Sequence, residues 1–197
     1  LSIPASVTKI DSSAFSGCTG LTAISIPASV DTIASSTFSD CTGLTSINIP
    51  VSITSIGSYA FENCTGLTSI NIPISITSIG SYAFKNCTGL SSIKLPGTIV
   101  TMGDYIFNNC INLTSVIFQN GIETLGRNMF SGCTSLATVE FSDSLKTIEA
   151  NAFNGCTGLT EIKLPKGLTT IKSGAFGNCT GLLSVEIPTS VTYLSGF

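Results

Sequence analysis

The stretch NCTGLTSINIPISITSIGSYAFKNCTGL, residues 63–90, begins to repeat itself before it ends. Its two cysteines, Cys64 and Cys87, lie 23 residues apart, and the same spacing separates every neighbouring pair of the eight cysteines in the chain. A fixed period of about 20–50 residues is typical of a solenoid, in which each coil buries its apolar side only by stacking on its neighbours. We therefore expect one continuous repeat structure over residues 1–197, with about 8.5 repeats of 23 residues.

The residues that follow each cysteine repeat a strand pattern. In the quoted unit, Leu67, Ile70 and Ile72 give the order L-x-x-I-x-I, and the equivalent positions are aliphatic or aromatic in the other units. Apolar residues that alternate with polar ones are typical of a half-buried strand. Pro73 follows directly, and because proline has no N–H to donate to a sheet, it marks the end of the strand. Each unit is therefore predicted to contain a short strand and then a turn.

A second apolar pair, Ile76 and Ile79, and then Phe84 complete the unit. Full burial of one aliphatic or aromatic side chain contributes about 1.5–3 kcal/mol. Ordering the backbone costs about 1–2 kcal/mol per residue, so the few apolar residues of one coil do not offset the ordering of that coil. Neighbouring coils must therefore stack on one another for any of them to be stable.

The L-x-x-I-x-I strand resembles the signature of leucine-rich repeats, and the fuller unit CTGLTSINIPISITSIGSYAF resembles the BspA-like class. The likeness extends over essentially the whole chain. It implies a β-rich right-handed solenoid with a parallel sheet on the concave face, and with short strands, turns and little helix on the convex side. Neither end has the polar cap of a finished solenoid, which leads us to expect a fragment of a longer protein.

The composition argues against several classes of function. Charged residues make up 10% of the chain and the net charge is −3, so we expect no nucleic-acid partner. No apolar run is long enough to span a membrane. The chain has no histidine and one arginine, and no nucleophile has an obvious base beside it. We therefore expect no enzymatic activity and no cofactor.

The cysteines allow three interpretations: disulfides, a metal site or buried free thiols. Neighbouring coils of a parallel stack lie about 4.8 Å apart, whereas a disulfide requires Cβ atoms about 3.5–4.5 Å apart in a particular orientation. A row of identical thiols without histidine does not form a tetrahedral metal site. We therefore favour free thiols that pack as small apolar residues. These cysteines are Cys18, Cys41, Cys64, Cys87, Cys110, Cys133, Cys156 and Cys179.

The strand positions five and seven residues after each cysteine should face outward and are free to vary. They are small and neutral in the first half of the chain but carry charge in the second half. In that second half Gln119 and Ser142 also replace the proline, and Asp143, Lys146 and Lys166 lie just past the strand. One hypothesis is a partner-binding patch, and the alternative is a solvated face without a partner. The predicted patch consists of Lys94, Ile117, Glu140, Glu161, Lys163 and Glu186.

A second candidate surface is a column of tyrosines on three successive coils, Tyr59, Tyr82 and Tyr105. Tyrosine is common at protein interfaces, and a row with a spacing of about 5 Å would form a continuous aromatic strip. The alternative is that the rings lie flat over the turn beside the phenylalanines, with only their hydroxyls in water.

The resemblance to the BspA-like class implies a secreted or cell-surface protein that binds host matrix proteins or other cells. We therefore expect an adhesin-type module with a protein ligand, a host matrix or cell-surface protein. The alternative is a spacer that holds another domain away from the cell. At about 4.8 Å per coil, the whole stack would be roughly 40 Å long.

Overall fold

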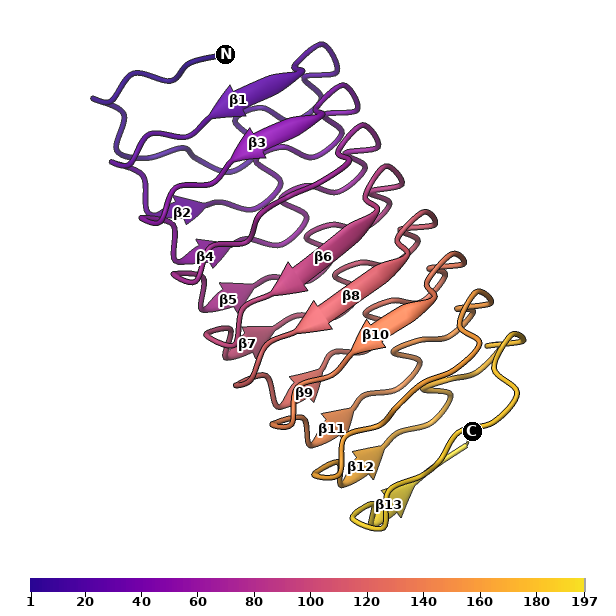
Figure 1. The fold of residues 1–197 in the computed structure, drawn as a ribbon. Helices are drawn as coiled ribbons and strands as arrows, with labels where there is room; N and C mark the ends of the chain where they lie inside the picture. Colours follow the sequence, from indigo (N-terminus) through magenta and orange to yellow (C-terminus); the bar gives the residue numbers. More distant parts are fainter. Residues whose placement is uncertain (197) are drawn as a thin grey trace.

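The computed structural model describes residues 1–196 as a stack of similar coils with short strands on two sides of the stack (Figure 1). Phe197, the last residue of the predicted domain, lies outside the described residues. No helix occurs in the described range, so the predicted leucine-rich repeat solenoid, rich in β-structure, is confirmed. We number the coils by their cysteines, so that Cys18 opens coil 1 and Cys179 opens coil 8.

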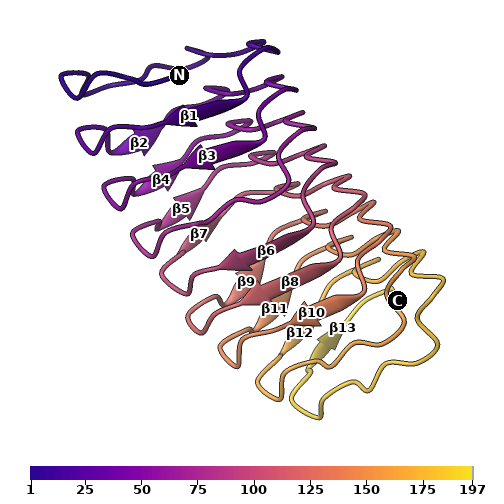
Figure 2. The ribbon, with the colours of Figure 1, turned by 45° about the horizontal axis from the view of Figure 1, so that its top comes forward.

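The strands form two parallel ladders on different sides of the coils (Figure 2). The first ladder holds the predicted L-x-x-I-x-I strands, which are β1 (Ala23–Ser25), β3 (Ser46–Asn48), β6 (Ser92–Leu95), β8 (Ser115–Phe118) and β10 (Thr138–Glu140). The second ladder holds shorter strands, which are β2 (Thr32–Ile33), β4 (Ser55–Ile56), β5 (Ser78–Ile79), β7 (Thr101–Met102), β9 (Thr124–Leu125), β11 (Thr147–Ile148), β12 (Thr170–Ile171) and β13 (Tyr193–Leu194).

The register within each ladder follows the 23-residue period. Ile93 of β6 is the partner of Val116 in β8, and Ser55 of β4 is the partner of Ser78 in β5. Along β6 the side chains alternate between exposed and buried, so that Ser92 and Lys94 face water while Ile93 and Leu95 face the core. The outward direction predicted for the two variable strand positions is therefore correct.

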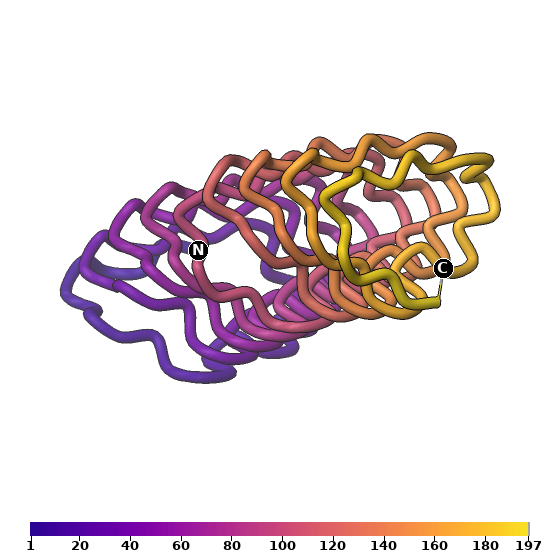
Figure 3. Tube along the Cα trace, turned by 90° about the horizontal axis from the view of Figure 1, so that it is seen from below, coloured from indigo at the N-terminus to yellow at the C-terminus, as the bar shows by residue number. Residues whose placement is uncertain are grey.

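One phenylalanine per coil forms a continuous column through the core. The rings of neighbouring coils stack with centroid distances of 5.1–5.5 Å and interplanar angles of 3–14°. Six of these rings, from Phe38 to Phe153, are fully buried. Figure 3 shows the coils stacked one behind another around this shared interior. Each ring between two others packs on both, so the column connects the segment before coil 1 with coils 1–7.

The cysteines are unpaired, and all except Cys18 are buried, as predicted. Each buried thiol also donates a hydrogen bond of 3.0–3.2 Å to the backbone carbonyl of the phenylalanine that lies 26 residues earlier in the chain. The same carbonyl accepts the amide N–H of the cysteine that follows the phenylalanine three residues later, as Phe61 does from Cys64. The cysteine therefore connects neighbouring coils by a polar contact as well as by packing, which the sequence pattern alone did not predict.

Each ladder is interrupted, at different coils. The first ladder has a two-stranded part, β1–β3, and a three-stranded part, β6–β8–β10, because within the described chain no strand forms at this position in coils 3, 7 and 8. The second ladder divides between β7 and β9 into two four-stranded parts. Where β6, β8 and β10 are closely paired, the other side of the stack opens between coils 4 and 5. The stack is therefore regular in its core and irregular on its surface.

Candidate protein-binding surface

The predicted patch lies along one column of the first ladder. Lys94, Ile117 and Glu140 are consecutive Cα partners across β6, β8 and β10. Lys163 and Glu186 continue the column on coils 7 and 8, outside any assigned strand. All of these are exposed except Ile117, which is half-buried, and Glu161 is exposed two residues before Lys163. The structure thus places the six residues on one face, and their role in binding stays a prediction.

Three depressions follow the turn after this column and share lining residues. Their volumes are about 720, 690 and 640 Å³, in order along the chain. The first and second share Phe141 and Asp143, while the second and third share Lys163, Leu164 and Lys166. Together they make one shallow groove, which we call the turn groove. Of the predicted patch, the residues that line it are Glu140, Lys163 and Glu186.

The turn groove begins at the units in which the repeat is broken. Gln119 and Ser142 stand where other coils have proline, and the Gln119 N–H donates to the Leu95 carbonyl, which no proline could do. Phe141, one residue before Ser142, is only half-buried and lines the groove. Beyond β10 the first ladder is no longer paired, which opens the surface between coils 6, 7 and 8.

Charged side chains line the middle of the turn groove in two opposed pairs. Glu140 and Asp143 belong to coil 6, and Lys163 and Lys166 belong to coil 7. All four are exposed, and among residues 1–196 none of them takes part in a salt bridge. Asp143 and Lys166 were not in the predicted patch, because they lie past the strand in a turn whose direction the strand pattern does not determine.

The tyrosines form the continuous strip that their spacing predicts. The ring centroids of Tyr59 and Tyr82 are 4.9 Å apart and those of Tyr82 and Tyr105 are 4.8 Å apart, with interplanar angles of 3° and 10°. The Lys85 ammonium lies 5.6 Å from the centre of the Tyr82 ring. Tyr59 is 39% exposed and the other two are half-buried. The rings thus stack on one another above the turns, and a binding role for the strip stays a hypothesis.

The backbone beneath the tyrosine strip is strained. All three tyrosines have φ near +60°, at a position where other coils have Ser, Asn or Gly with the same sign of φ. Asparagine and glycine adopt this left-handed conformation readily, whereas a bulky residue does so at a cost of about 1 kcal/mol or more. Ring stacking, which contributes about 0.5–1.5 kcal/mol per pair, offsets that cost.

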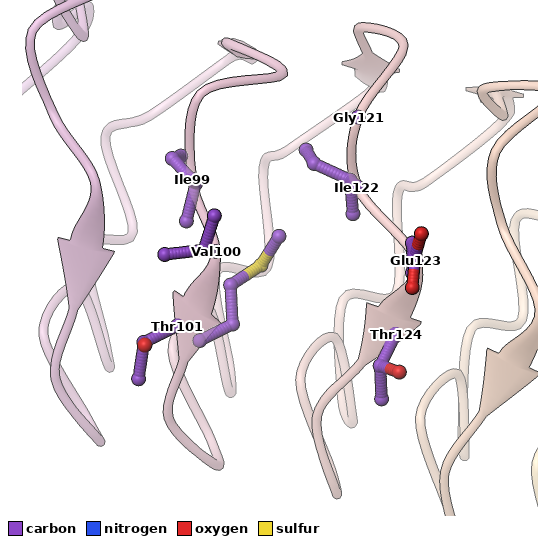
Figure 4. Close-up of a pocket in the computed structure, with 8 residues that line it drawn as sticks. Ile99, Val100, Thr101, Gly121, Ile122, Glu123 and Thr124 are labelled. Carbon is purple, nitrogen blue, oxygen red and sulfur yellow. The ribbon is translucent and has the colours of Figure 1, made fainter.

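A separate depression of about 480 Å³ lies on the other side of the stack, where β7 and β9 do not pair (Figure 4). The repeat would place hydrogen bonds from the Glu123 N–H to the Val100 carbonyl and from the Gly126 N–H to the Met102 carbonyl. Neither forms in the part of the chain that the structure describes. Apart from the Glu123 carboxylate, the side chains around it are aliphatic, Thr or Met, so no acid–base pair lines this depression.

The thiols of Cys87, Cys110 and Cys133, in the middle of the core, are poor nucleophiles. Burial raises the pKa of Cys133 to about 12 from its ordinary value of 9.0, and burial also raises the pKa of Cys87 and Cys110. These sulfurs therefore stay protonated at neutral pH, and thiolates are what attack substrates or bind metals. Within residues 1–196, no cluster of three or more His, Cys, Asp or Glu side chains could hold a metal ion. The same residues contain no helix that could cross a membrane.

Among solved structures, the chain is similar to a leucine-rich repeat protein of T. pallidum, with 28% identity and a TM-score of 0.75 over 81% of this chain and 77% of that one. It is also similar to a leucine-rich cell surface protein of Faecalibacterium prausnitzii, with 28% identity and a TM-score of 0.60 over 92% of this chain and 63% of the other. A leucine-rich repeat protein of Eubacterium ventriosum, 24% identical, has the same fold with a TM-score of 0.73 and is covered over 57% of its length, against 88% of this chain.

No curated protein matches the chain. The family described as the BspA type leucine rich repeat region matches residues 1–110 and 77–196, which together are nearly the whole sequence. The repeat spacing, the parallel ladders and the solved relatives agree with that match. The chain therefore belongs to the BspA-type leucine-rich repeat family.

Proposed function

We propose that this chain is the protein-binding module of a secreted or cell-surface protein of the adhesin type, and that the turn groove with the charged column beside it is the binding surface. Its partner would be a host matrix or cell-surface protein. The F. prausnitzii relative, a cell surface protein, supports the location. The proposal assigns no catalysis to the solenoid.

The observation that carries this proposal is the set of exposed, unpaired charges around a half-buried aromatic ring. Glu140, Asp143, Lys163 and Lys166 surround a floor made partly of Phe141 and Leu164. Apolar surface with a polar rim is the usual anatomy of a protein interface, and charges that are not paired internally are available to steer and orient a partner. The first three coils of the same column, with Ser25, Asn48 and Asn71, offer only serine and asparagine.

The test is capture of purified extracellular-matrix glycoproteins and of intact host cells by the immobilised chain. We expect the triple variant Ile117→Ser, Glu140→Ala, Lys163→Ala to lose at least about tenfold in affinity, because three neighbouring contacts are removed together. The matched control is Ser25→Ala, Asn48→Ala, Asn71→Ala, which changes the same column in the first half, where all three residues are exposed. Equal capture by the wild type and the triple variant would refute the proposed surface.

The alternative function is a spacer, and one observation favours it. The phenylalanine column runs unbroken from Phe15, just before coil 1, to Phe176 in coil 7, so the core is continuous over these coils even where the ladders open. A spacer needs such continuity and no specific surface. If neither the triple variant nor the control alters capture, and an insertion of two coils increases the hydrodynamic length in proportion, the spacer function is the better assignment.

A further inference from the structure

The turn groove has an acidic wall and a basic wall with matching positions. Lys163 follows Glu140 by one repeat, and Lys166 follows Asp143 by one repeat, so each base occupies the same place on coil 7 that its acid occupies on coil 6. All four side chains are exposed. If coil 6 of one molecule lies against coil 7 of a second, each acidic side chain therefore faces a basic one.

Elsewhere in the chain, oppositely charged residues one repeat apart form salt bridges. Lys85 and Glu62 approach to 3.1 Å, and Lys172 and Glu149 approach to 2.6 Å. In the described range, Glu140 with Lys163 and Asp143 with Lys166 do not close. The difference follows from the backbone, because the first ladder ends at β10 and the groove separates coil 6 from coil 7. Both pairs of charges are left to face outward.

We propose that the turn groove binds the same groove of a second copy of this chain, in a twofold-symmetric pair. A twofold axis parallel to the strands, midway between coils 6 and 7, sets coil 6 of one copy against coil 7 of the other. Glu140 then faces Lys163 of the second copy, and Asp143 faces its Lys166, and symmetry repeats both contacts. A self-complementary patch of this kind is what a twofold homodimer interface requires.

The surrounding positions agree with this axis. On the next coils outward, Ile117 faces Glu186 of the second copy, and Glu161 faces its Thr138, so no two like charges meet. An axis through coil 6 itself would instead set Glu140 against Glu140, which like-charge repulsion disfavours. The half-buried Phe141 and the Leu164 and Pro165 side chains supply apolar surface at the centre of the contact.

This inference rests on the proposed function, because it uses the same binding surface, and it adds a second partner for that surface, another copy of the chain. Such contacts would join two molecules on the same cell or on two neighbouring cells. Because all four charged side chains are exposed, the attraction is screened by salt. The association is therefore expected to be reversible and sensitive to ionic strength.

The experiment is sedimentation equilibrium of four charge variants over a range of protein concentrations. One variant carries Glu140→Lys and Asp143→Lys, which makes both walls basic, and a second carries Lys163→Glu and Lys166→Glu, which makes both walls acidic. A third carries all four changes. The control is Asp31→Lys with Glu123→Lys, which changes the net charge as the first variant does but at exposed residues outside the groove.

We expect the wild type, the four-residue variant and the control to form dimers at low salt. Each two-residue variant should associate at least about tenfold more weakly, since four attractions become repulsions, and an equimolar mixture of those two should associate as well as the wild type or better. Dimerisation should weaken at about 1 M salt, where the Debye length is about 3 Å. All substitutions are at exposed side chains, and far-UV circular dichroism is used to check that each variant is folded.

A wild type that stays monomeric at every concentration overturns the inference, and so do two-residue variants that dimerise as the wild type does. A mixture that fails to restore association overturns the twofold pairing. These results leave the proposed function intact if the triple variant Ile117→Ser, Glu140→Ala, Lys163→Ala still loses capture of matrix protein. Conversely, the expected dimerisation of the wild type and of the charge variants, without any capture of matrix protein, would support contact between two copies and refute a host ligand.

Discussion

Replacing Phe107 with alanine should destabilise the solenoid far more than the same change at Phe15. The Phe107 ring is fully buried and stacks on two others, at 5.3 Å from Phe84 and 5.4 Å from Phe130. Truncation of a buried phenylalanine costs about 3–5 kcal/mol. Phe15 is half-buried and, in the described range, stacks on Phe38 alone at 5.5 Å. Its loss should cost about 1–2 kcal/mol, since less area and one stacking contact of about 0.5–1.5 kcal/mol are removed.

The difference of about 2 kcal/mol or more is measured by urea unfolding followed by far-UV circular dichroism. Because solenoid stability is a sum of coil terms and interface terms, Phe107→Ala weakens two interfaces at the centre of the stack. It should also separate unfolding into two steps, one for each half. Losses at Phe107 and Phe15 that agree within about 0.5 kcal/mol would refute the view that the phenylalanine column connects the coils.

Three further predictions concern the turns, the thiols and the tyrosines. Gly80→Ala should lower the free energy of unfolding by about 1–3 kcal/mol, because the added Cβ would clash with the Ser58 backbone nitrogen. Gly20→Ala should be neutral in the same urea assay, because nothing lies within 4 Å of the added Cβ. Stability should fall as the pH rises from about 9 toward 12, since the folded state holds the Cys133 proton more tightly than the unfolded chain does. The Cys133→Ala variant should show a slope smaller by up to about 1.4 kcal/mol per pH unit, and an equal slope in both proteins would contradict this. Tyr82→Phe should change stability by less than about 0.5 kcal/mol, because the Tyr82 hydroxyl makes no hydrogen bond among residues 1–196, and a larger loss would show that the hydroxyl has a partner.

Most of the fold could be predicted because every coil buries apolar side chains at the same positions of the repeat. The L-x-x-I-x-I spacing, as in Leu90, Ile93 and Leu95, predicts a strand with one buried and one exposed face, and the 23-residue period places it in register with its neighbours. The same spacing in Leu67, Ile70 and Ile72 forms no strand in coil 3. The buried thiols and the phenylalanine column follow from the same periodicity. Outward-facing positions could be identified too, since strand side chains alternate by geometry alone.

The turn groove could be predicted only in part. The loss of proline at Gln119 and Ser142 indicated where the surface changes, but no single residue in the sequence marks the end of first-ladder pairing after β10. The same holds for the opening between β7 and β9, where the strands themselves are still present. Asp143 and Lys166 became part of the site because the turn placed them on the walls of a groove that the strand pattern does not describe.

In this chain, the places where ladder pairing ends are also the places where side chains are left free to bind a partner. Where the ladders are paired, backbone groups and same-column charges are satisfied within the molecule, as Glu62 and Lys85 are, so a partner gains little by contacting them. Where the first ladder ends, charges of both signs stay unpaired around a half-buried Phe141, and the buried core beneath continues without a break. A solenoid can therefore open its surface locally at small cost to its stability, because the phenylalanine column and the other ladder still hold neighbouring coils together at those places.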